Sequence, residues 1–171
     1  MRKVSLIQKL AVFAFVFILL VGCSNSDTDS QGSDENVKII QTYLENELKG
    51  PSDELKKILE QEGPYPPELE AYLEENYKPL VADLERLVNS TLVLIWLREA
   101  AENGYQLQPT NIEIQKTNSV GAYDFEVKVE YSKDDQTNTA TITGRININE
   151  DGKIVSIRNI HGFELLEELG Q

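Results

Sequence analysis

The chain has 171 residues, of which 40% are hydrophobic and 26% are charged, as in an ordinary globular protein. Its 29 acidic residues outnumber 16 lysines and arginines, which gives a formal net charge of -13. A field of that sign repels nucleic-acid phosphates and anionic lipid headgroups, so we expect neither as a direct ligand. The single cysteine excludes an intramolecular disulfide and a zinc site built from several cysteines.

Residues 1–22 have the order of regions that is typical of a secretory signal peptide. Arg2, Lys3 and Lys9 form a basic region, and residues 10–21 follow as an apolar run without charges. We therefore predict that residues 1–22 are a signal peptide. The alternative is an uncleaved anchor, although the apolar run is short for a membrane span of about 20 residues.

The end of this segment, Leu20-Val21-Gly22-Cys23, resembles the lipobox of bacterial lipoproteins. The resemblance implies that a diacylglycerol is attached to the thiol of Cys23 and that cleavage makes this cysteine the new N-terminus. It also implies a place at the cell membrane, on the extracytoplasmic face, with the lipid as the membrane contact. Ser24 follows the cysteine, where lipoproteins retained at an inner membrane carry an aspartate.

Residues 24–35 contain no apolar side chain. Such a segment cannot offset the entropy lost on ordering, so we predict a flexible polar tether from Cys23 to the folded part. We predict one α+β domain over residues 36–171. It consists of helices over 36–104, a sheet over 105–161 and a tail over 162–171, in which residues 163–169 add a helical turn.

The first part of this domain is expected to be helical. Apolar residues at three- and four-residue steps predict a helix over residues 36–48, which ends at Gly50-Pro51. Ser52 is expected to cap a short second helix, because a serine in this position accepts a hydrogen bond from the first turn. Pro67 is expected to begin a third helix, since proline suits the first helical position.

Residues 80–103 are expected to form the most apolar helix, with Pro79 in its first turn and Gly104 just past its end. One alternative is that Pro79 kinks a single longer helix. Another is that residues 91–97 form a buried strand, because periodicity alone does not separate a buried strand from a buried helix.

After Gly104 the apolar period changes from 3.6 to 2, which indicates strands. We predict four strands, around Ile112 and Ile114 and over residues 123–131, 140–148 and 153–160. Tight turns at residues 133–136 and 150–152 join them into an antiparallel meander. Gly144, in the middle of a strand, is expected to mark a bulge or a sharp bend.

Helices followed by a meander predict an α+β fold with a helical layer on one face of an antiparallel sheet of about four strands. The element order over residues 80–160 resembles the cystatin-like group, which includes the nuclear-transport-factor-2-like folds. The resemblance implies a curved sheet that wraps a long helix. Members of that group range from enzymes to assembly adaptors, so the fold does not by itself assign a function.

No constellation in the sequence predicts catalysis, a metal site or a cofactor. His161 is the only histidine; it precedes Gly162 in a loop position and has no nucleophile motif beside it. Acidic pairs such as Glu74-Glu75 point apart on a helix, and the spacing of a calcium loop is missing. We therefore predict a protein that is not an enzyme.

Aromatic residues are the remaining candidates for a binding surface. If the resemblance holds, a concavity lies between the helix of Trp96 and the strand of Tyr123 and Tyr131, where related folds place ligands. The alternative is that these are core residues with polar tips at the rim. Tyr65, followed by two prolines, is expected to be an exposed apolar contact for a partner.

These expectations lead to one hypothesis and one alternative. The hypothesis is a lipid-anchored extracytoplasmic module that binds a partner protein or a small ligand, for example as an accessory of an envelope complex. The alternative is an enzyme that acts on envelope material through carboxylates in the concavity. An open cavity with two facing, desolvated carboxylates would favour the enzyme, whereas a filled apolar interior would leave surface recognition.

Overall fold

The structure is a computed structural model that describes residues 27–61, 63, 66–90 and 92–171. The predictions for the signal peptide, Cys23 and Tyr65 therefore lie outside the described residues. The chain divides into two compact units, Met1–Gln31 and Gly32–Gln171. All described core residues belong to the second unit, so this unit has a hydrophobic core of its own and is expected to fold alone.

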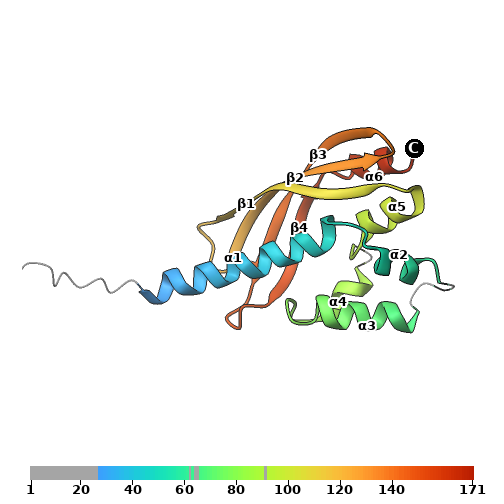
Figure 1. Cartoon of the computed structure of the whole chain (residues 1–171). Helices are drawn as coiled ribbons and strands as arrows, with labels where there is room; N and C mark the ends of the chain where they lie inside the picture. The colour runs from blue at the N-terminus through green and yellow to red at the C-terminus, as the bar shows by residue number, and fades with distance from the viewer. Residues whose placement is uncertain (1–26, 62, 64–65, 91) are drawn as a thin grey trace, which may run out of the picture. The chain divides into compact units, whose positions relative to one another are not determined.

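The C-terminal half forms a four-stranded antiparallel sheet in the order β1-β2-β3-β4, as predicted (Figure 1). Its strands are β1 (Gln106–Lys116), β2 (Ala122–Lys133), β3 (Gln136–Ile148) and β4 (Ile154–His161). Buried and exposed residues alternate along β2 from Tyr123 to Tyr131, so one face of the strand meets the core and the other meets solvent. The predicted α+β class is confirmed.

Gly144 is the position at which β3 needs a glycine. It pairs with Phe125 of β2, and a Cβ atom at residue 144 would lie 2.7 Å from Cζ of that phenylalanine. The register between β3 and β4 shifts between Thr143 and Arg145. The predicted irregularity at Gly144 is therefore confirmed, and the close approach of the Phe125 ring explains it.

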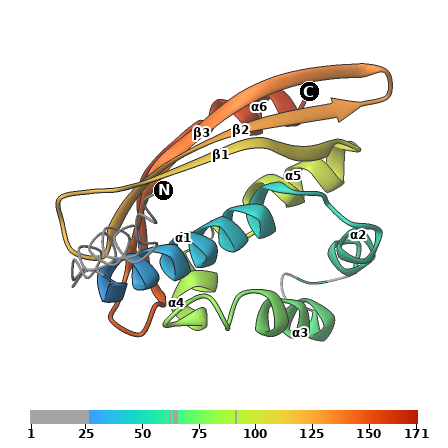
Figure 2. The same ribbon diagram turned by 60° about the vertical axis from the view of Figure 1, so that its left-hand side comes forward.

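Helices cover one face of this sheet, and α1 lies between the sheet and the helices α3 and α4 (Figure 2). The helices of the described residues are α1 (Asp27–Leu48), α2 (Asp53–Leu59), α3 (Pro67–Asn76), α4 (Leu84–Asn89), α5 (Ile95–Asn103) and α6 (Glu164–Leu169). Ser52 Oγ accepts a hydrogen bond from the Leu55 amide at 3.1 Å, so the predicted cap of α2 is confirmed. Pro67 begins α3, and Gly104 ends α5 with a φ of 76°.

The helix α1 begins earlier than the sequence predicts. Its first residue is Asp27, so residues 27–35, which were expected to be a flexible tether, have helical backbone. Once the apolar stretch from residue 36 to residue 48 has formed a helix, each further residue adds a backbone hydrogen bond without a new nucleation cost. Residues 24–26 of the predicted tether lie outside the described residues.

The prediction of one helix over residues 80–103 is wrong, and so is the prediction that Pro79 begins a helix. Leu80 and Ala82 instead lie beside the first residue of β4. The Ile154 amide donates to the Leu80 carbonyl and the Ala82 amide donates to the Ile154 carbonyl, each at 2.9 Å. Asp83 then caps α4, which begins at Leu84. Contacts with a distant strand thus replace the helical hydrogen bonds that periodicity predicts.

A turn at Leu94 precedes α5, so the described residues 92–97 do not form the alternative strand either. Leu94 is fully buried and has a φ of 59°, a left-handed conformation that is uncommon for leucine. Its amide donates to Oε2 of Glu47 in α1 at 2.9 Å. This charge-assisted hydrogen bond and the burial of the leucine side chain stabilise the turn. The partner is 47 residues away, so the local sequence could not reveal it.

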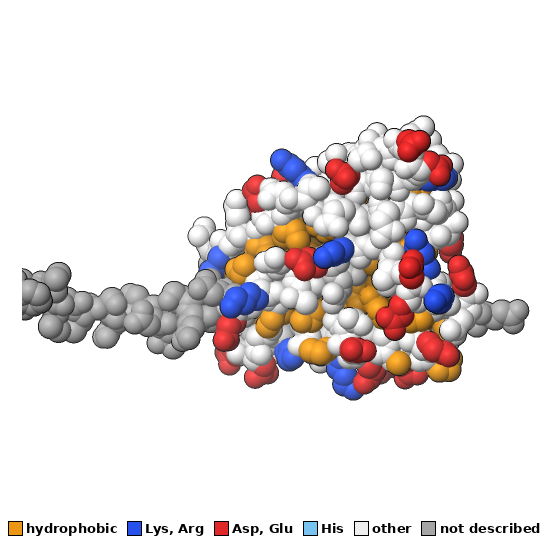
Figure 3. Space-filling model, in the orientation of Figure 1, with side chains coloured by type: hydrophobic (Ala, Val, Ile, Leu, Met, Phe, Trp, Pro, Cys, Tyr) orange, Lys and Arg blue, Asp and Glu red, His pale blue; other side chains and the backbone are white. Residues whose placement is uncertain are grey.

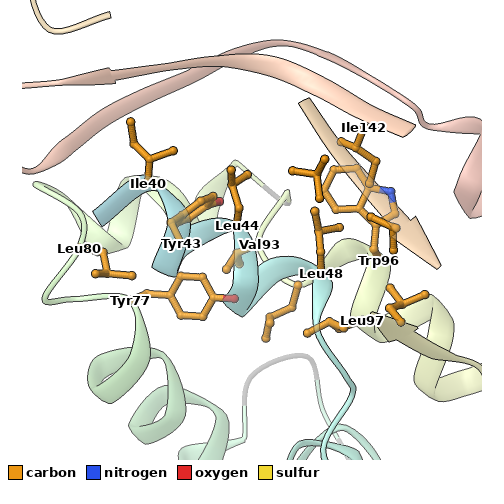
Figure 4. Packing of buried hydrophobic residues seen from close by; sticks show 14 of the residues in the cluster. Ile40, Tyr43, Leu44, Leu48, Tyr77, Leu80, Val93, Trp96, Leu97 and Ile142 are labelled. Carbon is orange, nitrogen blue, oxygen red and sulfur yellow. The ribbon is translucent and has the colours of Figure 1, made fainter. Parts of the chain in front are cut away.

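The core lies between the sheet and the helices. Figure 4 shows buried side chains of α1 between Ile142 on the sheet and Tyr77 and Leu80 from the helical side. On the face shown in Figure 3, hydrophobic side chains show in the seam between sheet and helices, among scattered acidic and basic ones. Within the described ranges, no helix has both the length and the hydrophobicity that crossing a bilayer requires.

Candidate functional site

A cavity of about 290 Å³ lies between the C-terminal half of α1, the α4 segment and the edge strand β4. Its size is close to the lower end of small-molecule sites, which run from about 300 to 1,000 Å³. Most of its wall is apolar. Apolar lining residues include Leu44, Leu48, Leu87, Leu92, Phe125, Ile142, Ile154, Ile157 and Ile160. A cavity with such a wall suits the apolar part of a small molecule.

The sequence builds this cavity through local features on three elements. On α1, Leu44 and Leu48 are one turn apart, so both point to the same side of the helix. The Asp83 cap fixes the start of α4, and Leu87 lies one turn further on. The hydrogen bonds between residues 80–82 and Ile154 hold the α4 segment against β4. The cavity wall is therefore anchored at both sides.

Exposed polar residues mark the entrance of the cavity. Asp83, Arg86, Ser90 and Arg158 line it and are all solvent-exposed. The Asp83 carboxylate accepts a hydrogen bond from the Arg86 amide at 2.9 Å, because it caps α4. The two arginines place positive charge at this entrance, although the protein as a whole is strongly acidic.

Glu47 is the one buried charged residue that the structure describes, with 2% of its surface exposed. It lines the cavity, and its Oε2 accepts the hydrogen bond from the Leu94 amide. Its Oε1 has no hydrogen-bond partner among the described residues. The hydroxyls of Tyr77 and Tyr43 lie next to this carboxyl and reduce the cost of burying it.

Burial raises the pKa of Glu47 to about 7, because a desolvated carboxylate is disfavoured. The Leu94 amide opposes this shift most, and the neighbouring hydroxyls of Tyr77 and Tyr43 oppose it less. The Tyr77 hydroxyl donates its own hydrogen bond to the Asn46 carbonyl at 3.0 Å. At neutral pH the Glu47 carboxyl is therefore close to the midpoint of its titration.

Trp96 supplies the second buried polar atom at the cavity. Its side chain is 5% exposed and stacks on Phe163, with ring centroids 5.9 Å apart and an interplanar angle of 18°. Its Nε1 has no hydrogen-bond partner in the described part of the chain. Buried indole N–H groups usually have an acceptor. Trp96 and Glu47 thus each contribute one deeply buried polar atom beside the cavity.

The structure separates the aromatic residues that the sequence suggested as one surface. Trp96 lines the cavity, but Tyr123 and Tyr131 do not. The Tyr123 hydroxyl accepts from Nδ2 of Asn36 at 3.1 Å, and the Tyr131 ring lies 6.1 Å from the Tyr105 ring. Eight residues along a strand span about 26 Å, so the two tyrosines lie at opposite ends of β2. The cavity opens at β4 instead.

Sequence reasoning missed Glu47, although the sequence holds a signal for it. Glu47 follows Tyr43 by four residues and Leu44 by three, so it falls within the apolar stripe of its helix. An acidic residue at such a position is expected to be buried with a specific partner. The arginines at the entrance carry no comparable signal, because they come together only through the fold.

The other candidate centres do not join this site. His161 is exposed at the end of β4. Within the described ranges, no three residues of the types His, Cys, Asp and Glu are arranged to hold a metal ion. Comparison of the chain with protein families, with curated proteins and with solved structures finds no match in any of the three. The function is therefore argued from the cavity itself.

Proposed function

We propose that this protein is a lipid-anchored extracytoplasmic module that binds a small, mainly apolar ligand in the cavity without transforming it. The observation that carries the proposal is the cavity of about 290 Å³, whose wall is mostly apolar and whose lining also includes the charged side chains of Asp83, Arg86 and Arg158. A largely apolar pocket with a few polar groups at its rim is the usual form of a small-molecule site.

The carboxylates of the site favour binding over hydrolysis. A hydrolase that works through paired carboxylates needs two that face each other. Of the acidic residues described at this cavity, Glu47 is buried, whereas Asp83 is exposed and engaged as the cap of α4. One buried carboxyl beside an apolar wall supports recognition of a polar group on the ligand.

The described surface supports a small ligand rather than a partner protein. The large hydrophobic residues that are exposed among the described residues are Val120, Val155 and Phe163. They are few and separated in the chain, and single exposed hydrophobic residues need no partner. The membrane location rests on the resemblance of Leu20-Val21-Gly22-Cys23 to a lipobox.

Trp96 provides a direct test, because it is the only tryptophan of the chain and it lines the cavity. Fragment 27–171 is titrated with p-xylene, an apolar probe, while Trp96 fluorescence is recorded. We expect a saturable change that Leu87→Phe abolishes, because a larger side chain fills the cavity. Leu59→Phe is the matched control, since Leu59 packs at the core outside the cavity. Binding that both variants retain, or no binding to the wild type, would contradict the proposal.

A further inference from the structure

The charged side chains at the entrance of the cavity define a narrower class of ligand. We propose that the cavity takes a small amphipathic anion. Its apolar part fills the cavity, and its carboxylate stays at the entrance beside the guanidinium of Arg86. Arg158 adds a second positive charge to the same entrance. This inference rests on the proposed function, because it names the ligand of the same cavity.

Arg86 lies on the side of α4 that faces the cavity. Four residues of α4 and its caps line the cavity, at a spacing of three, one and three residues that places them on one side of the helix. They are Asp83, Arg86, Leu87 and Ser90. Leu87 is half-buried, whereas Arg86 is exposed. This side of α4 therefore presents an apolar wall residue next to a charged group in water, which suits an amphipathic ligand.

Neither arginine of the entrance is neutralised by an ion pair within the part of the chain that the structure describes. The ion pairs there are Lys78–Glu74 and Arg145–Asp124. The acidic residue at the entrance is Asp83, whose carboxylate accepts from the backbone amide of Arg86 as the cap of α4. Two positive charges against one negative charge leave the entrance with a net positive charge, which complements a carboxylate.

The inner part of the cavity determines which end of the ligand enters. Its wall is mostly apolar, and the buried acid beside it is Glu47. A ligand carboxylate that moved inward would lose its water and approach a second acid, which costs free energy in a medium of low dielectric constant. The apolar end therefore enters, and the carboxylate stays at the entrance. An ammonium group in the same place would lie beside two arginines, so it is disfavoured.

The volume of the cavity limits the apolar part of the ligand. At roughly 30 Å³ for each water-sized group, about 290 Å³ holds roughly ten non-hydrogen atoms. A methyl-substituted aromatic ring with a short alkyl linker fits this limit. In 3-(4-methylphenyl)propanoate, such a linker lets the ring occupy the cavity while the carboxylate remains in water at the entrance.

A matched series of probes tests the charge of the ligand. The propanoate, the uncharged 3-(4-methylphenyl)propanamide and 2-(4-methylphenyl)ethylammonium are each titrated into fragment 27–171 while Trp96 fluorescence is recorded. At low salt we expect the propanoate to bind about three- to fivefold more tightly than the amide, because an ion pair at an exposed arginine contributes a modest free energy. The ammonium is expected to bind more weakly than the amide.

The salt dependence separates the attraction at the entrance from the charge of the whole protein. The formal net charge of -13 repels anions, and added salt screens this repulsion as well as any local attraction. If the arginines dominate, as we propose, the preference for the propanoate over the amide falls towards one as the salt concentration rises. If the net charge dominates, the affinity of the propanoate relative to the amide rises instead.

Arg86→Gln assigns the preference to the named side chain. It should make the propanoate bind like the amide and leave amide and p-xylene binding unchanged, because glutamine keeps a polar side chain but has no charge. Arg98→Gln is the matched control, which removes the same charge from α5 outside the cavity and should keep the preference.

The outcomes distinguish this inference from the proposed function. If the amide or the ammonium binds as tightly as the propanoate, the ligand class is wrong and the cavity remains a binding site. A preference that rises with salt, or that Arg86→Gln retains, also overturns the ligand class alone. If neither p-xylene nor any of the three probes binds, both the inference and the proposed function fail.

Discussion

The two ends of α1 meet the rest of the domain in different ways. Near the N-terminal end of its described side chains, Asn36 donates to the Tyr123 hydroxyl, and Ile40 is fully buried in the core. At the C-terminal end, Tyr43 and Glu47 line a cavity, and Glu47 retains a carboxyl oxygen without a described partner. Packing is complete where the helix only stabilises the fold, and incomplete where we propose that it binds a ligand.

The largest expected effect on the free energy of unfolding comes from Ile40, which lies in the fully packed part of α1. Ile40→Ala should lower the free energy of unfolding by about 3 kcal/mol, because it removes a fully buried side chain and leaves a new cavity. Leu87→Ala should cost clearly less, since Leu87 is half-buried and borders a cavity that already exists. Urea denaturation measures both. Equal losses would mean that the side of α4 that borders the cavity is packed as completely as the core around Ile40.

The second prediction concerns how stability depends on pH through Glu47, which lies in the part of α1 that borders the cavity. The folded-state pKa of Glu47, about 7, is above its ordinary value of 4.5, so the folded protein binds this proton more tightly than the unfolded chain. The resulting stability is fully present below about pH 4.5 and is lost as the pH rises to about 7, by about 3 kcal/mol in total.

Glu47→Gln isolates this contribution, because glutamine can still accept from the Leu94 amide but does not titrate. The stability of wild type relative to this variant should fall by about 3 kcal/mol between pH 4.5 and pH 8, as measured by urea denaturation at each pH. Glu75→Gln, at an exposed position of α3, is the control and should follow wild type. A constant difference between wild type and Glu47→Gln would show that Glu47 is not desolvated.

A smaller effect on stability is expected from the hydrogen bond between Asn36 of α1 and Tyr123 of β2. Tyr123→Phe removes the hydroxyl that accepts from Asn36 and should lower the free energy of unfolding by about 1 kcal/mol. It should leave p-xylene binding unchanged, because Tyr123 does not line the cavity. Loss of p-xylene binding in this folded variant would show that the two ends of α1 are coupled.

The smallest effect is expected on the solvent face of the sheet. Arg145 of β3 bonds to Asp124 of β2 through Nε and Nη2, at 2.6 and 3.0 Å. The pair holds the pKa of the Asp124 carboxyl below its usual range, chiefly through the hydrogen bond from Arg145. Because solvent and salt screen this pair, Asp124→Asn should scarcely change the melting temperature at moderate salt. A large decrease would show that the solvent face contributes as much as the core.

Features of the fold that depend on neighbouring residues could be predicted from the sequence, whereas those that depend on distant contacts could not. The strands, the Ser52 cap, the start at Pro67 and the bend at Gly144 follow from neighbouring residues, and each was confirmed. The break in the predicted helix over residues 80–103 depends on the contact of Leu94 with Glu47, 47 residues away. The pairing of residues 80–82 with Ile154 is equally distant, so periodicity could not show either.

The candidate site was predictable only in part. Trp96 lines the cavity, whereas Tyr123 and Tyr131, which the sequence prediction grouped with it around one concavity, do not. Glu47 could have been found as an acidic residue in an apolar stripe. Its free oxygen and its raised pKa depend on the turn that buries it, and that turn is a tertiary feature.

The central claim is that the cavity beside Glu47 and Trp96 is a ligand site. Titration of p-xylene into fragment 27–171, followed by the fluorescence of Trp96, tests it most directly. We predict a saturable change in wild type and in Leu59→Phe, and none in Leu87→Phe. An unchanged signal in wild type, or an equal change in Leu87→Phe, would contradict the claim.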